Sequence, residues 1–250
     1  MKITYPTKLR WYKPVVTDPL ELYGKKNQKR IRSTIKKEHD VGISHSFEKL
    51  DEDFLSWFTP YYTDIIGNKK NAVVHDLYQA TLGNETRISE YWALTLYENG
   101  TVVGASIIGI RTERIMIAFK AHENRWRTPS LQSSPSLYSD YIACSYAHKL
   151  KKDYISHGQD RNLYGMNSNI GLAVFKLSTG YYPCLLEKSE TYTTEILDTS
   201  TITTDTLILE HPIDGDMIKK SYLFTSPENE AKYTQLAQYS NLLEVEVGHY

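Results

Sequence analysis

The chain has 250 residues, of which 40% are hydrophobic and 24% are charged, and its net charge is −1. This near-neutral charge excludes a protein whose whole surface binds a polyanion, and the length allows one large domain or two small ones. Tyrosine is abundant, with 20 Tyr against 6 Phe. Tyrosine side chains often line polar clefts or sheet surfaces, although a compositional habit of the source explains the count equally well.

Two cysteines, Cys144 and Cys184, are too few for a disulfide framework or a cysteine-based metal cluster. Both lie in apolar patterns, which predicts buried free thiols and a reducing compartment. Residues 1–10 lack the apolar core of a signal peptide, and no run reaches the roughly 18 apolar residues that a membrane span needs. The histidines show no metal-ligand spacing. We therefore expect a cytoplasmic protein with neither a membrane span nor a metal.

The N-terminal segment Met1–Gly24 is interrupted by three prolines, which predicts an irregular, extended arm. Residues Lys25–Lys37 follow with many basic side chains and no acidic one. Ile31 and Ile35 lie four residues apart, so a helix here can dock one face and leave the rest basic. The basic face is either simply solvated or a patch for the phosphates of a cofactor or an RNA.

Two helices are predicted after a short strand over Val41–Phe47. Leu50–Ile66 has an acidic first turn followed by apolar residues, and acidic residues there complement the helix dipole. Pro60 is expected to kink or split this helix. Asn71–Leu82 shows a second helical pattern, which Gly83-Asn84 ends.

The period then changes to that of β-strands. Tyr91–Tyr97 alternates, Asn99-Gly100 is a strong hairpin signal, and Thr101–Ile110 is rich in Val and Ile. Arg114–Lys120 continues as a third strand after a short turn. Consecutive strands joined by tight turns predict an antiparallel meander.

The second half of the chain alternates helices and strands after a polar loop over Arg125–Pro135. The expected elements are a helix over Ser136–Lys151, a strand over Tyr154–Ser156, a helix over Asn169–Ser178, strands over Tyr181–Leu186, Thr193–Leu197 and Thr206–Leu209, and a terminal helix over Glu228–Asn241. Mixed elements around a central meander predict an α+β fold with helices on both faces of the sheet.

This order of elements resembles the GNAT acyltransferase superfamily, in which an antiparallel start of the sheet leads to a parallel pair. The pair here is Arg114–Lys120 with Tyr154–Ser156, joined by the helix from Ser136 through a right-handed crossover. The superfamily also has an Asn followed eleven residues later by Gly and an aromatic, as Asn169 is followed by Gly180-Tyr181. The resemblance implies a mixed, mostly antiparallel sheet whose two parallel strands splay apart and admit an acyl thioester.

Two segments are similar to the Fem-like branch of that superfamily. Arg30–Phe47 runs from a basic helix into Gly-Ile and a strand, as that branch does. Its phenylalanine-lysine…glycine pattern is matched by Leu172, Phe175, Lys176 and Gly180. The expected layout is an extended arm over 1–24, an acyltransferase domain over 25–200, and a strand and helix extension over 201–250 packed on the same domain.

The loop before the crossover helix departs from the usual GNAT pyrophosphate loop. That loop carries Gln or Arg followed by spaced glycines, whereas Arg125–Ser136 has no glycine. Guanidinium groups and free amides at a helix N-terminus can still hold a phosphate. With acyl-CoA as the donor that the resemblance implies, the expected donor-binding residues are Arg125, Arg127, Ser134, Ser136, Asn167, Asn169 and Lys176. Lys176 also stands where the superfamily often has a general-acid tyrosine.

Acyl transfer to an amine needs a base for the ammonium proton and a donor for the oxyanion. His157 is the natural base, because its ordinary pKa of about 6.5 leaves it mostly neutral near pH 7. Asp160 is the alternative base or a counter-ion for the amine, and Tyr164 completes the expected catalytic set on the loop after the strand. The side chains expected to face the acceptor are Tyr138, Asp140, Tyr141, Arg161 and Tyr181.

Simpler structural roles stay open for the same positions. His157 can cap a carbonyl at the strand end, and Asp160 can form a turn beside Gly158. Asn167 or Ser168 can be a helix N-cap. Lys176 can be a surface lysine that extends its charged end to the solvent.

The leading hypothesis is an N-acyltransferase that moves an acyl group from acyl-CoA to an amine of a small molecule, an amino sugar or an amino acid by direct attack. The Fem-like resemblance implies an alternative, with aminoacyl-tRNA as the donor and a peptide or peptidoglycan precursor as the acceptor. A third hypothesis is a non-catalytic binding protein that keeps the fold. Exposed strand edges in the last third of the chain also allow a homodimer.

Overall fold

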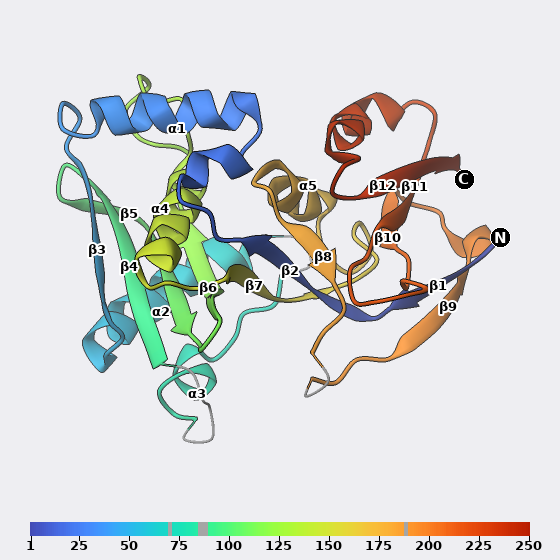
Figure 1. Cartoon of the computed structure of the whole chain (residues 1–250), viewed down its shortest axis with the longest axis horizontal. Helices are drawn as coiled ribbons and strands as arrows, with labels where there is room; N and C mark the ends of the chain where they lie inside the picture. Colours follow the sequence, from blue (N-terminus) through green and yellow to red (C-terminus); the bar gives the residue numbers. More distant parts are fainter. Residues whose placement is uncertain (70–71, 85–89, 188–189) are drawn as a thin grey trace. The chain divides into compact units, whose positions relative to one another are not determined.

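The structure, a computed structural model, describes residues 1–69, 72–84, 90–187 and 190–250 (Figure 1). The chain forms two compact units, which we name by their place in the sequence. The terminal unit consists of Met1–Lys13 and Gln159–Tyr250, and the central unit is Pro14–Gly158. The domain layout expected from the sequence, with an acyltransferase domain over 25–200, stays a prediction. Residues 1–13 belong to the terminal unit because the first strands of the chain pair with strands of its last third.

The central unit contains a mixed sheet in the order β3 (Ile43–Lys49), β4 (Glu90–Glu98), β5 (Thr101–Ile110), β6 (Arg114–His122) and β7 (Tyr154–Arg161). Neighbours from β3 to β6 are antiparallel, and β7 is parallel to β6. The predicted meander and the predicted parallel pair are therefore confirmed. Strand β7 is longer than predicted, so that His157 and Asp160 lie on the strand and not on the loop after it.

Helices cover both faces of this sheet. Helix α2 (Glu52–Gly67) packs its apolar side on a core that includes Ile107 of β5. Helix α4 (Pro135–Lys149) lies against the other face, where Ser139 and Ser106 approach to 3.4 Å. Since successive strand residues point to opposite faces, Ser106 and Ile107 place the two helices on opposite sides. The α+β class with helices on both faces is confirmed.

Three further elements complete the central unit. Helix α1 spans Lys25–Lys37 as predicted and buries Ile31 and Thr34. The 3-10 turn η1 is Pro19–Leu22. Of the helix predicted over Asn71–Leu82, the structure has only α3 (Leu77–Ala80), which starts after its N-cap Asp76. The first residue of the predicted helix, Asn71, lies outside the described residues. Helix α2 runs through Pro60 without a break.

The terminal unit contains α5 (Ile170–Ser178) and several sets of paired strands, of which β2 and β8 are the last two in the order of the seven-stranded sheet. The antiparallel pairs are β1 (Lys2–Pro6) with β9 (Thr194–Asp198), and β2 (Lys8–Pro14) with β8 (Tyr182–Cys184). A further sheet has the order β10 (Thr206–Leu209), β11 (Lys220–Thr225) and β12 (Glu244–His249). The 3-10 segment η2 (Thr199–Thr201) precedes β10 in the chain, and η3 (Glu230–Tyr239) connects β11 to β12.

The expectation of an irregular N-terminal arm is wrong. Pro6 and Pro14 stand at the ends of β1 and β2, where a missing N–H does not interrupt a ladder. The terminal helix expected over Glu228–Asn241 is also wrong, because this stretch is the 3-10 segment η3. Strands β11 and β12 are missed, since the alternating Glu and Val of β12 resemble a solvated segment.

We expect Gly104→Ala to lower the free energy of unfolding by about 1–3 kcal/mol. A Cβ atom at Gly104 would lie 2.2 Å from Cδ2 and 3.1 Å from Cβ of His122, so ring rotation alone cannot relieve the clash. Burial also lowers the pKa of His122 to about 3, which keeps the ring neutral in the folded protein. The matched control is Gly67→Ala, where the nearest atom is 3.8 Å away. Equal urea midpoints for the two variants would contradict this packing account.

Candidate functional site

The parallel pair covers only the first half of each of its strands. Paired positions run from Arg114 and Tyr154 to Ile117 and His157, and both strands continue past the last pair. His157 is 4% exposed at this last paired position. The neighbouring Ser156 is fully buried, and its Oγ has no hydrogen-bond partner within the described part of the chain. The predicted base therefore lies inside the central unit.

A buried polar network in the terminal unit joins β2, the last residues of β7 and α5. Lys176 Nζ donates to Asp160 Oδ2 at 2.5 Å, and Tyr164 Oη donates to the same oxygen at 2.7 Å. Trp11 Nε1 donates to Tyr164 Oη at 2.9 Å. The Lys176 ammonium also lies 5.7 Å from the centre of the Trp11 ring, within cation–π range. The Lys176 and Asp160 side chains are 2% and 10% exposed.

Burial sets the electrostatics of this network. It lowers the pKa of Lys176 below its ordinary value, and the ion pair with Asp160 opposes that shift. Burial, with the Asp160 charge as the second cause, raises the pKa of Tyr164 well above 10. Tyr164 thus keeps its proton and donates a hydrogen bond to Asp160. In this arrangement Tyr164 orients the carboxylate, which in turn orients the lysine.

Other cations are buried in the same unit. Lys13 Nζ donates to the Thr179 carbonyl at 3.0 Å and stands 4.3 Å from the centre of the Tyr181 ring. Arg10 forms an ion pair with Glu190. Sequence reasoning missed Arg10, Trp11 and Lys13, because it treated their segment as an irregular arm. The run Lys8–Pro14 does carry a signal, since Leu9 and Trp11 alternate with polar residues.

The turn after β7 is held by Asn162, which the sequence analysis did not single out. Its side-chain nitrogen donates to the carbonyls of Pro6 and Leu209, and its side-chain oxygen accepts from the amides of Leu163 and Leu209. Leu163 has a positive φ of 59°. Of the predicted donor-binding residues nearby, Asn169 is the N-cap of α5 and accepts from the Gly171 amide. The remaining one, Asn167, donates to the Asn162 carbonyl at 3.2 Å.

The glycine-free loop before α4 already uses its amides within the central unit. The Glu98 carboxylate, on a side chain that is almost fully buried, accepts from the backbone N–H groups of Arg127 and Thr128 at 3.0 and 3.1 Å. At the helix itself, Ser134 is the N-cap and accepts from the Leu137 amide. Arg125 is exposed. Two amides of this loop are thus already bonded to an internal carboxylate.

The remaining predicted residues are placed as follows. Ser136 lies in the first turn of α4. Tyr138 donates to Glu38 at 2.5 Å, and burial raises its pKa. Asp140 is buried and accepts from Tyr23 at 2.6 Å, which ties α4 to the segment before α1. Of the other residues expected to face the acceptor, Tyr141 is stacked on Tyr138 in the central unit. In the terminal unit, Arg161 is exposed and Tyr181 is buried.

Across residues 1–69, 72–84, 90–187 and 190–250, no three His, Cys, Asp or Glu side chains gather as a metal site. In the same ranges, every helix is too short or too polar to cross a bilayer.

No protein-family model matches the chain, and no curated protein does. Among solved structures, FemX is similar over 72% of this chain with 14% sequence identity and a TM-score of 0.52. L-PGS from Bacillus licheniformis is similar over 78% of this chain and 60% of its own length, with 13% identity and a TM-score of 0.45. A tandem GNAT protein from the clavulanic acid biosynthesis pathway is similar over 72% of this chain and 50% of its own, with 10% identity and a TM-score of 0.41.

The chain spans 60% of the length of FemX. At this identity the match shows the fold alone. The protein therefore shares the fold of FemX, in line with the Fem-like resemblance of the sequence.

Proposed function

We propose that this protein transfers an aminoacyl group from an aminoacyl-tRNA ester to an amine. The observation that carries this proposal is the buried Lys176–Asp160 pair in a chain of FemX-like fold. A buried ion pair costs desolvation free energy and is weak evidence for stability, so its presence favours a functional reason. Acyl transfer supplies one, because it develops negative charge on a carbonyl oxygen.

Lys176 is the proposed donor to that oxyanion. An ammonium has three N–H donors, and within the described residues Lys176 makes one hydrogen bond, to Asp160. The amine nitrogen attacks the ester carbon and the C=O electron pair moves onto oxygen. Collapse of this intermediate breaks the bond to the ribose oxygen, which receives the proton lost by the amine. His157 stays our prediction for the base that takes this proton first.

The choice of donor rests on the loop before α4. CoA carries a pyrophosphate, and its usual geometry in the superfamily uses loop amides at this position. Here the amides of Arg127 and Thr128 are bonded to Glu98, and Ser134 caps the helix. This favours the aminoacyl-tRNA alternative over acyl-CoA, while the acceptor chemistry stays that of an amine.

Helix α1 supports an RNA donor. Of its basic residues, Lys25, Lys26, Lys29, Arg32 and Lys36 are exposed. The helix contains no acidic residue to neutralise them. A row of cations on an exposed face binds phosphates and gives a salt-dependent affinity.

We expect bulk tRNA to bind the protein with a salt-dependent affinity, and acetyl-CoA to leave the melting temperature unchanged at high excess. The triple variant Lys26→Glu, Lys29→Glu and Arg32→Glu should weaken tRNA binding at least about tenfold and flatten its salt dependence. The matched control reverses three exposed lysines of the terminal unit, Lys8, Lys219 and Lys232. Stabilisation by acetyl-CoA with no tRNA binding would contradict the donor assignment.

A further inference from the structure

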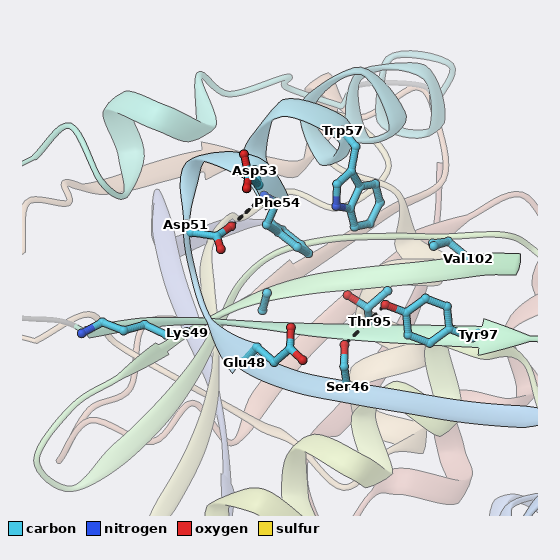
Figure 2. A pocket seen from close by; sticks show the side chains of 11 residues that line it. Ser46, Glu48, Lys49, Asp51, Asp53, Phe54, Trp57, Thr95, Tyr97 and Val102 are labelled. Carbon is cyan, nitrogen blue, oxygen red and sulfur yellow. Dashed lines mark hydrogen bonds between the residues drawn. The ribbon is translucent and has the colours of Figure 1, made fainter. Parts of the chain in front are cut away.

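A groove of about 380 Å³ opens in the central unit between the first turns of α2 and the sheet (Figure 2). Its floor is formed by β4, with β3 and β5 on either side. The apolar core under α2 includes Phe58, which lies further along the helix than the groove, and Ile107 of β5. The strip of sheet beside the start of α2 is left open, and nothing in the proposed transfer chemistry uses it.

Thr95 on the groove floor is a polar side chain that lacks a partner. It is 2% exposed, and the described residues offer its hydroxyl no hydrogen bond. Two neighbouring side chains do pair, since Oγ of Ser46, which lies opposite Thr95 on β3, is 3.5 Å from Oη of Tyr97 on β4. The hydroxyl oxygen of Thr95 keeps some accessible surface although the residue is almost fully buried, so it is open to the groove and can accept a hydrogen bond from a ligand atom.

The rim of the groove is negative. Glu48 on β3 and Asp53 in the first turn of α2 both line it, and within the described residues neither carboxylate has an ion-pair partner. The helix dipole accounts for Asp53 but not for Glu48, which lies on a strand. Lys49 pairs with Glu90 at 3.5 Å, and Figure 2 shows its side chain pointing away from Thr95. The groove therefore attracts a cation.

One wall of the groove is aromatic. Trp57 is half-buried and packs edge-on against Phe54, with ring centres 4.9 Å apart. An indole face stabilises both an alkyl chain and a nearby ammonium group. A metal ion fits this wall poorly, and residues described in the groove form no metal-ligand cluster.

We propose that this groove binds a primary alkylammonium group, as on the lysine side chain of a peptide. The ammonium donates to the Thr95 hydroxyl and to the Glu48 and Asp53 carboxylates, and its alkyl chain lies against Trp57. The groove is centred on β4, three strands from β7 and thus about 14 Å from the strand of His157. The bound group is therefore a recognition feature and not the amine that is acylated.

Calorimetric titration of the full chain with Nα-acetyl-lysine amide tests the proposal. We expect saturable binding with a dissociation constant of about 1 mM or lower, and no binding of the neutral Nα-acetyl-norleucine amide. Titration with 1,5-diaminopentane separates a free diamine from a peptide source. If the diamine binds as tightly as the lysine probe, the site recognises the alkylammonium group alone; if it binds more weakly, the peptide backbone of the probe also contributes to binding.

Thr95→Val and Glu48→Gln should each weaken binding of the lysine probe about tenfold. Glu52→Gln is the control, because Glu52 is an exposed carboxylate of α2 outside the groove. Glu48 is exposed on its strand, so its variant keeps the test valid if Thr95→Val folds poorly. Equal binding of the norleucine probe, absence of saturable lysine binding, or unchanged affinity in both variants would overturn the proposal. These results do not depend on tRNA binding or on transfer.

Discussion

Replacement of Lys176 by Met should lower the rate of aminoacyl transfer by about 100- to 1,000-fold. The physical reason is the loss of the proposed donor to the developing oxyanion. Hydroxylamine is a suitable acceptor for this measurement, because it is a small amine nucleophile that requires no knowledge of the natural acceptor. The rate of aminoacyl-hydroxamate formation from aminoacyl-tRNA is compared between the wild type and the variant.

The same substitution also changes stability, and this effect must be separated from catalysis. Without Lys176, the Asp160 carboxylate is left buried without its counter-ion, which should cost about 3–5 kcal/mol of unfolding free energy. The double variant Lys176→Met with Asp160→Leu removes both charges and should recover most of that stability. Recovery of stability without recovery of transfer supports a catalytic role. A double variant with wild-type transfer would assign the pair to folding alone.

Replacement of Asn162 by Ala should lower the free energy of unfolding by about 4 kcal/mol or more, because two carbonyls and two amides lose a buried partner. These groups belong to Pro6, Leu163 and Leu209, so one side chain joins segments that are far apart in the sequence. The loss is measured by urea unfolding followed by circular dichroism.

Asn167→Ala is the control for this prediction. Among the described residues its side chain makes one hydrogen bond, at 3.2 Å to the Asn162 carbonyl, and it is only half-buried. We expect a loss of about 1 kcal/mol. Similar losses for Asn162→Ala and Asn167→Ala would show that the turn after β7 is not held by Asn162.

Local signals predicted the elements of the central unit well. Asn99-Gly100 indicated a hairpin, and both residues do adopt positive φ, 51° and 74°, as a type I′ turn requires. The basic run Lys25–Lys37 forms a helix with those bounds, because Ile31 gives it a face to bury. The parallel pair followed from the order of elements.

Long-range contacts explain what the sequence did not reveal. Trp11 and Tyr164 are 153 residues apart, and no local pattern connects them. Prolines at strand ends made β1 and β2 resemble an irregular arm. Lys176 was recognised through the Fem-like pattern, and Asp160 was expected as an alternative base or a counter-ion for the amine, but no local pattern revealed that Asp160 is bonded to Lys176 and Tyr164.

The central claim is that this protein moves an aminoacyl group from tRNA to an amine. The most direct measurement compares hydroxamate formation from aminoacyl-tRNA and from acetyl-CoA, with and without the protein, at equal donor concentrations. Our account predicts that the protein accelerates the reaction of aminoacyl-tRNA and leaves that of acetyl-CoA at its uncatalysed rate. Acceleration with acetyl-CoA alone, or with neither donor, would contradict it.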